Sequence, residues 1–77
     1  MTTAEVKRLI ENGIPGAIAV VVDTTGTGDH FRAQVTATQF ANLSAVAQHR
    51  MVFATLVDVM SGDHAPLHAL DLKTHRP

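Results

Sequence analysis

The stretch AIAVVVDTTGTGDHFRAQVTAT, residues 17–38, decides the fold because it contains two strand patterns joined by a turn-rich segment. Ala17 to Val22 is a short apolar run, mostly β-branched, that predicts a strand with apolar residues on both faces. From Phe31 to Thr38, apolar and polar residues alternate, which predicts a strand with one buried face. The polar segment Asp23 to Asp29 contains glycines and predicts a long, mobile hairpin loop. We therefore expect the two strands to pair antiparallel.

A short amphipathic helix is predicted before this hairpin. Thr3 is a suitable N-cap, and Glu5 follows in the first turn, where the helix dipole favours an acidic residue. The pattern extends to about Asn12, and Gly13 is expected to end the helix in a left-handed C-cap. The apolar stripe of this helix, which must pack against another element, consists of Val6, Leu9 and Ile10.

A long helix is predicted after the hairpin, from the N-cap Ser44 to a stop at Ser61–Gly62. Helical spacing predicts an apolar face that packs on the sheet and an opposite face in solvent. The apolar face comprises Val46, His49, Phe53, Leu56, Val57 and Met60, and the solvent face comprises Ser44, Gln48, Thr55 and Asp58.

A third strand is predicted from Leu67 to Leu72, after an irregular segment in which Pro66 excludes a helix. Residues 73–77 are expected to fray. Because a helix connects the second and third strands, these two strands should run parallel. The predicted fold class is α+β: a two-layer sandwich in the order α-β-β-α-β, whose three-stranded mixed sheet carries its helices on one face. A single domain over residues 1–77 is expected, since so short a chain can form only one compact core.

The composition excludes several classes of protein. The 77 residues include no cysteine, so this chain alone can form neither a disulfide nor a thiolate metal site. The 6 basic and 7 acidic residues leave no basic field for nucleic acid. No apolar run approaches the roughly 20 residues of a membrane span, and no signal peptide is evident, so we expect a cytoplasmic protein without a membrane partner. No nucleophile motif is present, so we do not expect an enzyme.

The 5 histidines are the unusual feature of the composition, because imidazole is the strongest metal ligand left to a chain without cysteine. His30 and His68 open the second and third predicted strands, and parallel pairing would bring both to the same end of the sheet. The spacing alone favours two ordinary polar residues at strand starts over a metal site.

The other histidines carry weaker signals. His64 and His68 form an H-x-x-x-H pattern, but Pro66 prevents the helix that a zinc-protease motif requires, so His64 is only a minor alternative ligand. His49 lies within the apolar stripe of the long helix and is assigned a structural role, and His75 carries no signal. Asp29 precedes His30 directly and could orient its imidazole.

Two further patterns bear on nucleic-acid binding. Residues 13–16 match the G-x-x-G of KH domains, but here the motif joins a helix to a strand and contains no basic residue. A modest basic patch is conceivable if the second and third strands adjoin, although scattered solvated charges explain the same residues equally well. Its members would be Arg32, Arg50, Lys73 and Arg76.

Several motifs resemble the BolA family over nearly the whole chain. They are His30-Phe31-Arg32, Phe40, Gln48-His49-Arg50-Met51-Val52 and His68-Ala69-Leu70-Asp71-Leu72-Lys73-Thr74. The string that begins at His68 is the most specific of them. The family often has Arg-His where this chain has Gln48-His49, and usually Phe-acid-Gly where this chain has Phe40-Ala41-Asn42.

The resemblance implies a fold similar to class II KH domains and an interaction module for iron–sulfur trafficking or iron sensing. Members of the family bind monothiol glutaredoxins and share a [2Fe–2S] cluster with them; the glutaredoxin supplies one cysteine and a bound glutathione thiol. Carried over by position, the ligands from this chain are His68 and His30, so the isolated chain is expected to hold no cluster. The alternatives are a KH-like transcriptional regulator that binds nucleic acid weakly, and a self-associating homodimer without a metal.

Overall fold

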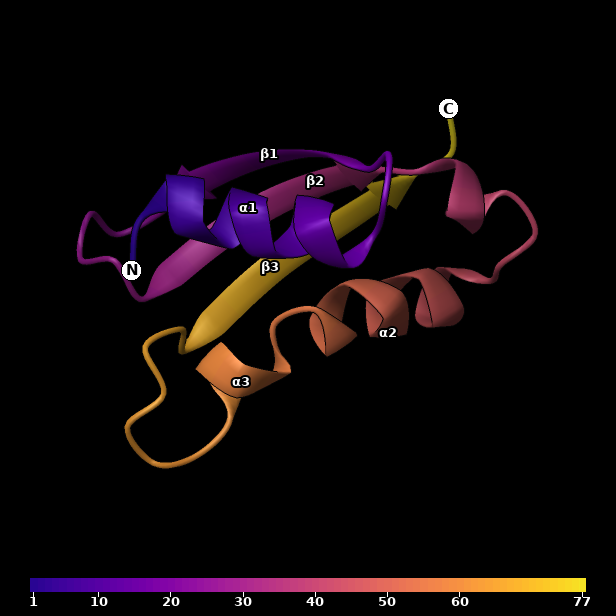
Figure 1. Ribbon diagram of the computed structural model, residues 1–77. Coiled ribbons are helices and arrows are strands. Elements are labelled where there is room, and N and C mark those ends of the chain that lie inside the picture. Colours follow the sequence, from indigo (N-terminus) through magenta and orange to yellow (C-terminus); the bar gives the residue numbers. More distant parts are fainter.

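The computed structural model describes residues 1–77 and confirms the predicted α+β fold (Figure 1). The elements follow in the order α1 (Thr3–Gly13), β1 (Ile18–Asp23), β2 (His30–Thr36), η1 (Thr38–Phe40), α2 (Ala45–Ala54), α3 (Val57–Met60) and β3 (Ala69–His75). The sheet has three strands in the order β1-β2-β3. β1 is antiparallel to β2, and β2 is parallel to β3, as the sequence predicts.

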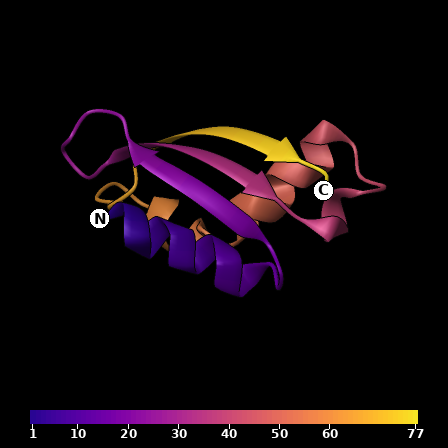
Figure 2. The same ribbon diagram turned by 90° about the horizontal axis from the view of Figure 1, so that it is seen from above.

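The helices cover one face of the sheet, and the core lies between these two layers (Figure 2). On β2, the central strand, residues with side chains toward the helices are buried and alternate with residues in solvent. The largest fully buried side chains are Phe31, Phe40, Ile10, Leu56, Leu67, Val6, Val35 and Val52. On the uncovered face, β1 exposes Ile18, Val20 and Val22 by 52–62%. None of the helices has the length and apolar character needed to cross a bilayer.

Both ends of α1 differ in detail from the prediction. The N-cap is Thr2 and not Thr3: Thr2 and Glu5 form a capping box with two hydrogen bonds of 3.1 Å. Gly13 is the last helical residue and does not have a positive φ, so the predicted left-handed cap is wrong. A Cβ atom at Gly13 would collide with the side chain of Thr55. The glycine therefore allows the end of α1 to lie against the end of α2.

The predicted long helix is interrupted after Ala54, which gives the separate helices α2 and α3. Thr55 N–H bonds to the carbonyls of Val52 and Phe53, and its hydroxyl donates to the Val52 carbonyl at 2.7 Å. Leu56 then leaves the helical region with φ −113° and ψ 7°. The break reorients the chain, so the predicted apolar face does not continue along one helix.

The predicted faces of this region are also wrong. Val46 and Val57 are 60% and 55% exposed, whereas the buried residues are Gln48, Val52 and Leu56. Gln48 and Val52 are four residues apart and share one side of α2, whereas Leu56 is buried at the break between α2 and α3. The amide of Gln48 donates to the carbonyls of Phe40 and Leu43 at 3.2 and 3.0 Å, and its oxygen accepts from Thr74 at 2.5 Å. These partners allow a polar side chain to occupy a buried position that the sequence pattern assigns to solvent.

The third strand lies later in the chain than predicted. Leu67 is buried but precedes the strand, which starts at Ala69, so His68 lies one residue before β3. Residues 73–75 were expected to fray, yet they pair with β2 as far as His75 opposite Thr36. β2 in turn ends at Thr36 and not at Thr38, where the 3-10 turn η1 begins.

Candidate functional site

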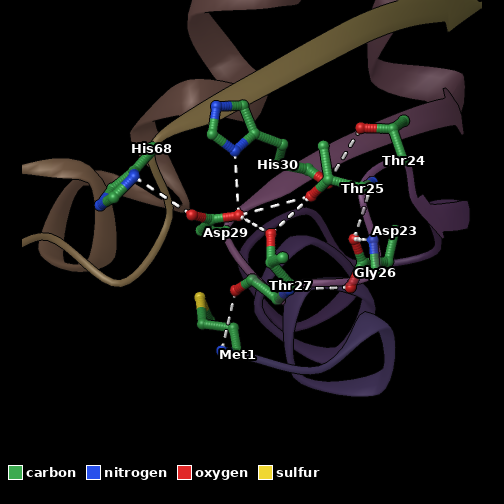
Figure 3. Close-up of polar contacts among 10 residues, drawn as sticks. Met1, Asp23, Thr24, Thr25, Gly26, Thr27, Asp29, His30 and His68 are labelled. Atoms are coloured by element: carbon green, nitrogen blue, oxygen red, sulfur yellow. Dashed lines mark hydrogen bonds and ion pairs between the residues drawn. The ribbon is translucent and has the colours of Figure 1, made fainter.

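The loop between β1 and β2, which was expected to be mobile, is crossed by hydrogen bonds. One carboxylate oxygen of Asp23 accepts from the N–H groups of Thr25 and Gly26 at 3.2 and 2.9 Å, and the other accepts from Gly28 N–H at 2.9 Å. The Met1 amino group donates to the Gly28 carbonyl at 3.0 Å. These bonds give the segment that precedes His30 a defined path (Figure 3).

The structure brings His30 and His68 together at one end of the sheet. His30 is the first residue of β2 and pairs in register with Ala69, the first residue of β3. The main-chain carbonyl of Asp29 accepts from the N–H groups of His68 and Ala69 at 2.8 and 3.3 Å, which fixes the start of β3 beside the hairpin loop. The two imidazole centroids are 5.8 Å apart, and the ring planes are nearly perpendicular, at 86°.

The carboxylate of Asp29 lies between the two rings and contacts both (Figure 3). Oδ1 is 2.9 Å from Nδ1 of His30, and Oδ2 is 3.4 Å from Nδ1 of His68. The hydroxyls of Thr27 and Thr25 also donate to Oδ1, the latter at 3.5 Å. The side chains of His30 and His68 are 44% and 54% exposed, so the cluster is open to solvent.

The ionisation of Asp29 determines how the His30 ring is protonated. Hydrogen bonds from His30 and then Thr27 lower the pKa of Asp29 from 3.8 to about 2. The carboxylate is therefore charged at neutral pH and only accepts hydrogen bonds. Nδ1 of His30 consequently carries the proton in this contact, and the lone pair of the neutral ring is on Nε2.

The remaining histidines lie away from this cluster. His64 is exposed in the segment between α3 and β3 and lies outside the group formed by Asp29, His30 and His68. His75 is at the opposite end of β3, and His49 is a partly exposed residue of α2. The sequence indicated that Asp29 could orient an imidazole, but it gave no sign that the same carboxylate reaches His68 as well.

The residues that suggested nucleic-acid binding lie on several elements, and the condition for the predicted basic patch is met in that β2, with Arg32, pairs with β3, with Lys73. Residues 13–16 join α1 to β1, as predicted from the sequence. Arg32, the basic residue nearest to His30 on β2, is paired with Asp71 at 3.1 Å. Arg76 donates to the Ala41 carbonyl at 3.2 Å, at the other end of β3.

Fold and site together define a small α+β protein with a surface cluster of one aspartate and two histidines, residue types that can ligate a metal ion. The family model for BolA-like proteins matches residues 12–77 of the chain. The chain therefore belongs to the BolA family, as its sequence motifs indicate.

Individual relatives agree with this assignment. The structure of a BolA homologue from Coxiella burnetii is 36% identical, covers 100% of this chain and 92% of its own, and has a TM-score of 0.78. A BolA-like protein from Babesia bovis shares the fold with a TM-score of 0.83 at 19% identity, over 100% of this chain and 86% of that one. Human BolA-like protein 1 is 36% identical over 52 residues, which is 68% of this chain but only 36% of the human protein.

Proposed function

We propose that this chain is an interaction module that binds a monothiol glutaredoxin and supplies His30 and His68 as ligands to a shared [2Fe–2S] cluster, for cluster trafficking or iron sensing. The glutaredoxin would supply one cysteine, and glutathione would supply the other thiol. The cytoplasm, where glutathione keeps thiols reduced, is the proposed setting.

The observation that carries the proposal is the 5.8 Å separation of two half-exposed imidazoles from distant parts of the sequence. The rings come from the loop–β2 junction and from the segment before β3, and the parallel register of β2 and β3 keeps these segments together. Exposure on one open surface lets a visiting protein reach both rings. Membership in the BolA family supports the same assignment.

The donor set fits this cluster chemically. A chain without cysteine cannot provide thiolates, so a partner that brings sulfur is required. Two imidazoles in place of two thiolates raise the reduction potential of a [2Fe–2S] centre, which is the chemistry that this chain would contribute. An imidazole binds iron only when it is neutral, and histidine changes its charge between pH 5 and 8. Retention of the cluster should therefore weaken as the pH falls through this range.

The experiment is to titrate the chain into a reconstituted monothiol glutaredoxin and to follow visible absorbance and circular dichroism. We expect a new spectrum that saturates at one chain per cluster. His68→Ala should abolish the change, and His30→Ala should weaken or abolish it. His64→Ala is the matched control, because His64 lies near His68 in the sequence but outside the cluster.

The outcomes separate clearly. A spectrum identical to that of the glutaredoxin homodimer at every ratio contradicts the proposal, as does a wild-type response from His68→Ala. Loss of the response in His64→Ala would move the site away from the His30–His68 pair. Weak, salt-sensitive binding to duplex nucleic acid without any spectral change would favour the regulator alternative.

A further inference from the structure

We propose that the chain on its own binds one divalent transition-metal ion, of the zinc class, through Asp29, His30 and His68. This inference goes beyond the proposed function because it needs neither a partner protein nor sulfide nor glutathione. It adds a carboxylate ligand to the two histidines. It also gives the isolated chain a metal site, whereas the sequence analysis expects the isolated chain to hold no cofactor.

The donor atoms of the three side chains already converge. One ligand atom from each lies within 4.8 Å of the others. The carboxylate oxygens of Asp29 are 2.9 and 3.4 Å from Nδ1 of His30 and His68. A tetrahedral zinc ion with bonds of about 2.0–2.2 Å keeps neighbouring donor atoms roughly 3.3–3.6 Å apart, so only small rotations are needed to surround an ion. To bind the ion through Nδ1, each ring must be neutral with its proton on Nε2, so the proton that His30 donates from Nδ1 in the metal-free chain moves to Nε2 by exchange with water.

The surrounding contacts hold Asp29 in place for this role. Thr27 and Thr25 donate their hydroxyls to its carboxylate, and its main-chain carbonyl is bonded to the start of β3. Carboxylates that bind metals are commonly held by such outer hydrogen bonds. Both segments that carry the ligands are therefore ordered without the ion, which lowers the entropic cost of binding it.

The donor chemistry selects the class of cation. Two imidazoles and one carboxylate suit zinc, cobalt or ferrous iron, whereas magnesium and calcium prefer oxygen ligands throughout. All three side chains are partly exposed, by 30–54%, so water can complete the coordination.

The ion and the proposed cluster would require the same two histidines. This consequence rests on the proposed function: a zinc-loaded chain should fail to accept a cluster until the zinc is removed. The binding of the ion itself does not depend on that function.

The test uses the untagged, metal-free chain. Cobalt is titrated and its visible absorption recorded, and zinc binding is measured by calorimetry at about neutral pH, where imidazoles can release their protons. We expect one ion per chain. His68→Ala and Asp29→Asn should each weaken binding by roughly tenfold or more. His64→Ala and His75→Ala are the matched controls and should bind like the wild type.

Circular dichroism tests whether each variant is folded. If Asp29→Asn does not fold, His30→Ala provides another ligand substitution in its place. The inference is overturned if no saturable binding at one ion per chain is seen, if Asp29→Asn and His68→Ala bind like the wild type, or if the control variants lose binding equally. If the metal titration shows no binding but the glutaredoxin titration is positive, only the proposed ion site is contradicted. If cobalt binds in a way that depends on Asp29 but the chain gives no spectral response with glutaredoxin, only the proposed function is contradicted.

Discussion

Asp29 holds His68 in two ways: its main-chain carbonyl accepts the His68 N–H at 2.8 Å, and its carboxylate lies 3.4 Å from Nδ1 of the His68 ring. The same carboxylate accepts from His30 at 2.9 Å. One acidic residue therefore connects the hairpin loop, the start of β2 and the segment before β3. The arrangement of the candidate site depends on Asp29 as much as on the histidines.

The protonation of His30 is the first consequence that can be tested. Because the ionised Asp29 accepts from Nδ1, the neutral ring of His30 should carry its proton on Nδ1 in the metal-free chain. Nitrogen NMR shifts of the labelled histidine report this directly. In Asp29→Asn the preference should weaken or reverse. A wild-type ring protonated on Nε2 would contradict the described contact.

The acid stability of the chain should also depend on Asp29. Its pKa is depressed from 3.8 to about 2 on folding, so its contribution to stability is fully present above pH 3.8 and is lost as the pH falls toward 2. Urea unfolding of the wild type and Asp29→Asn over this range should show that the difference between them shrinks as the pH falls. A difference that stays constant from neutral pH to pH 2 would contradict the assignment.

Leu56 and Val57 provide a matched test of the interrupted helix. Leu56 is fully buried and Val57 is 55% exposed, although the sequence pattern places both on one apolar face. Leu56→Ala should lower the free energy of unfolding by about 2–5 kcal/mol. Val57→Ala should change it by about 0.5 kcal/mol or less. Denaturant unfolding distinguishes the two, and equal losses would favour the uninterrupted helix.

Gln48 should be essential to the packing of α2. Gln48→Leu keeps the volume but removes the side-chain donor to the Phe40 and Leu43 carbonyls, of which the Phe40 carbonyl still accepts from the Leu43 N–H, and it removes the acceptor of Thr74. We expect a loss of about 1–3 kcal/mol in the free energy of unfolding. Gln34→Leu, at an exposed position of β2, is the control and should be nearly neutral. A neutral Gln48→Leu would show that these bonds contribute nothing net.

Much of the fold follows from local sequence pattern. The β-branched run from Ile18 and the alternation from Phe31 specify two strands, and the helix before β3 implies its parallel pairing with β2. The helix break does not follow, because it depends on Thr55 bonding back to the Val52 carbonyl in place of continuing the helix. The burial of Gln48 depends on turn carbonyls whose positions only the tertiary structure fixes.

The site was predictable only in part. The proximity of His30 and His68 follows from parallel strands that start at the same end of a sheet. The alternation of Leu70, Leu72 and Thr74 with polar residues was a signal that β3 continues past Leu72, because it has the same period as β2. The contact between Asp29 and His68 was not predictable, since it is set by the path of the hairpin loop.

Pulsed EPR on a complex with glutaredoxin tests the central claim most directly. The chain is labelled with nitrogen-15 histidine, the glutaredoxin is left unlabelled, and the reduced [2Fe–2S] centre is examined. We predict couplings from two coordinated nitrogen-15 nuclei in the wild type. His30→Ala should lose one or both of them, His68→Ala should lose both because it does not form the shared cluster, and His64→Ala should change neither. A reduced cluster that shows no coupling to the labelled chain would contradict the account.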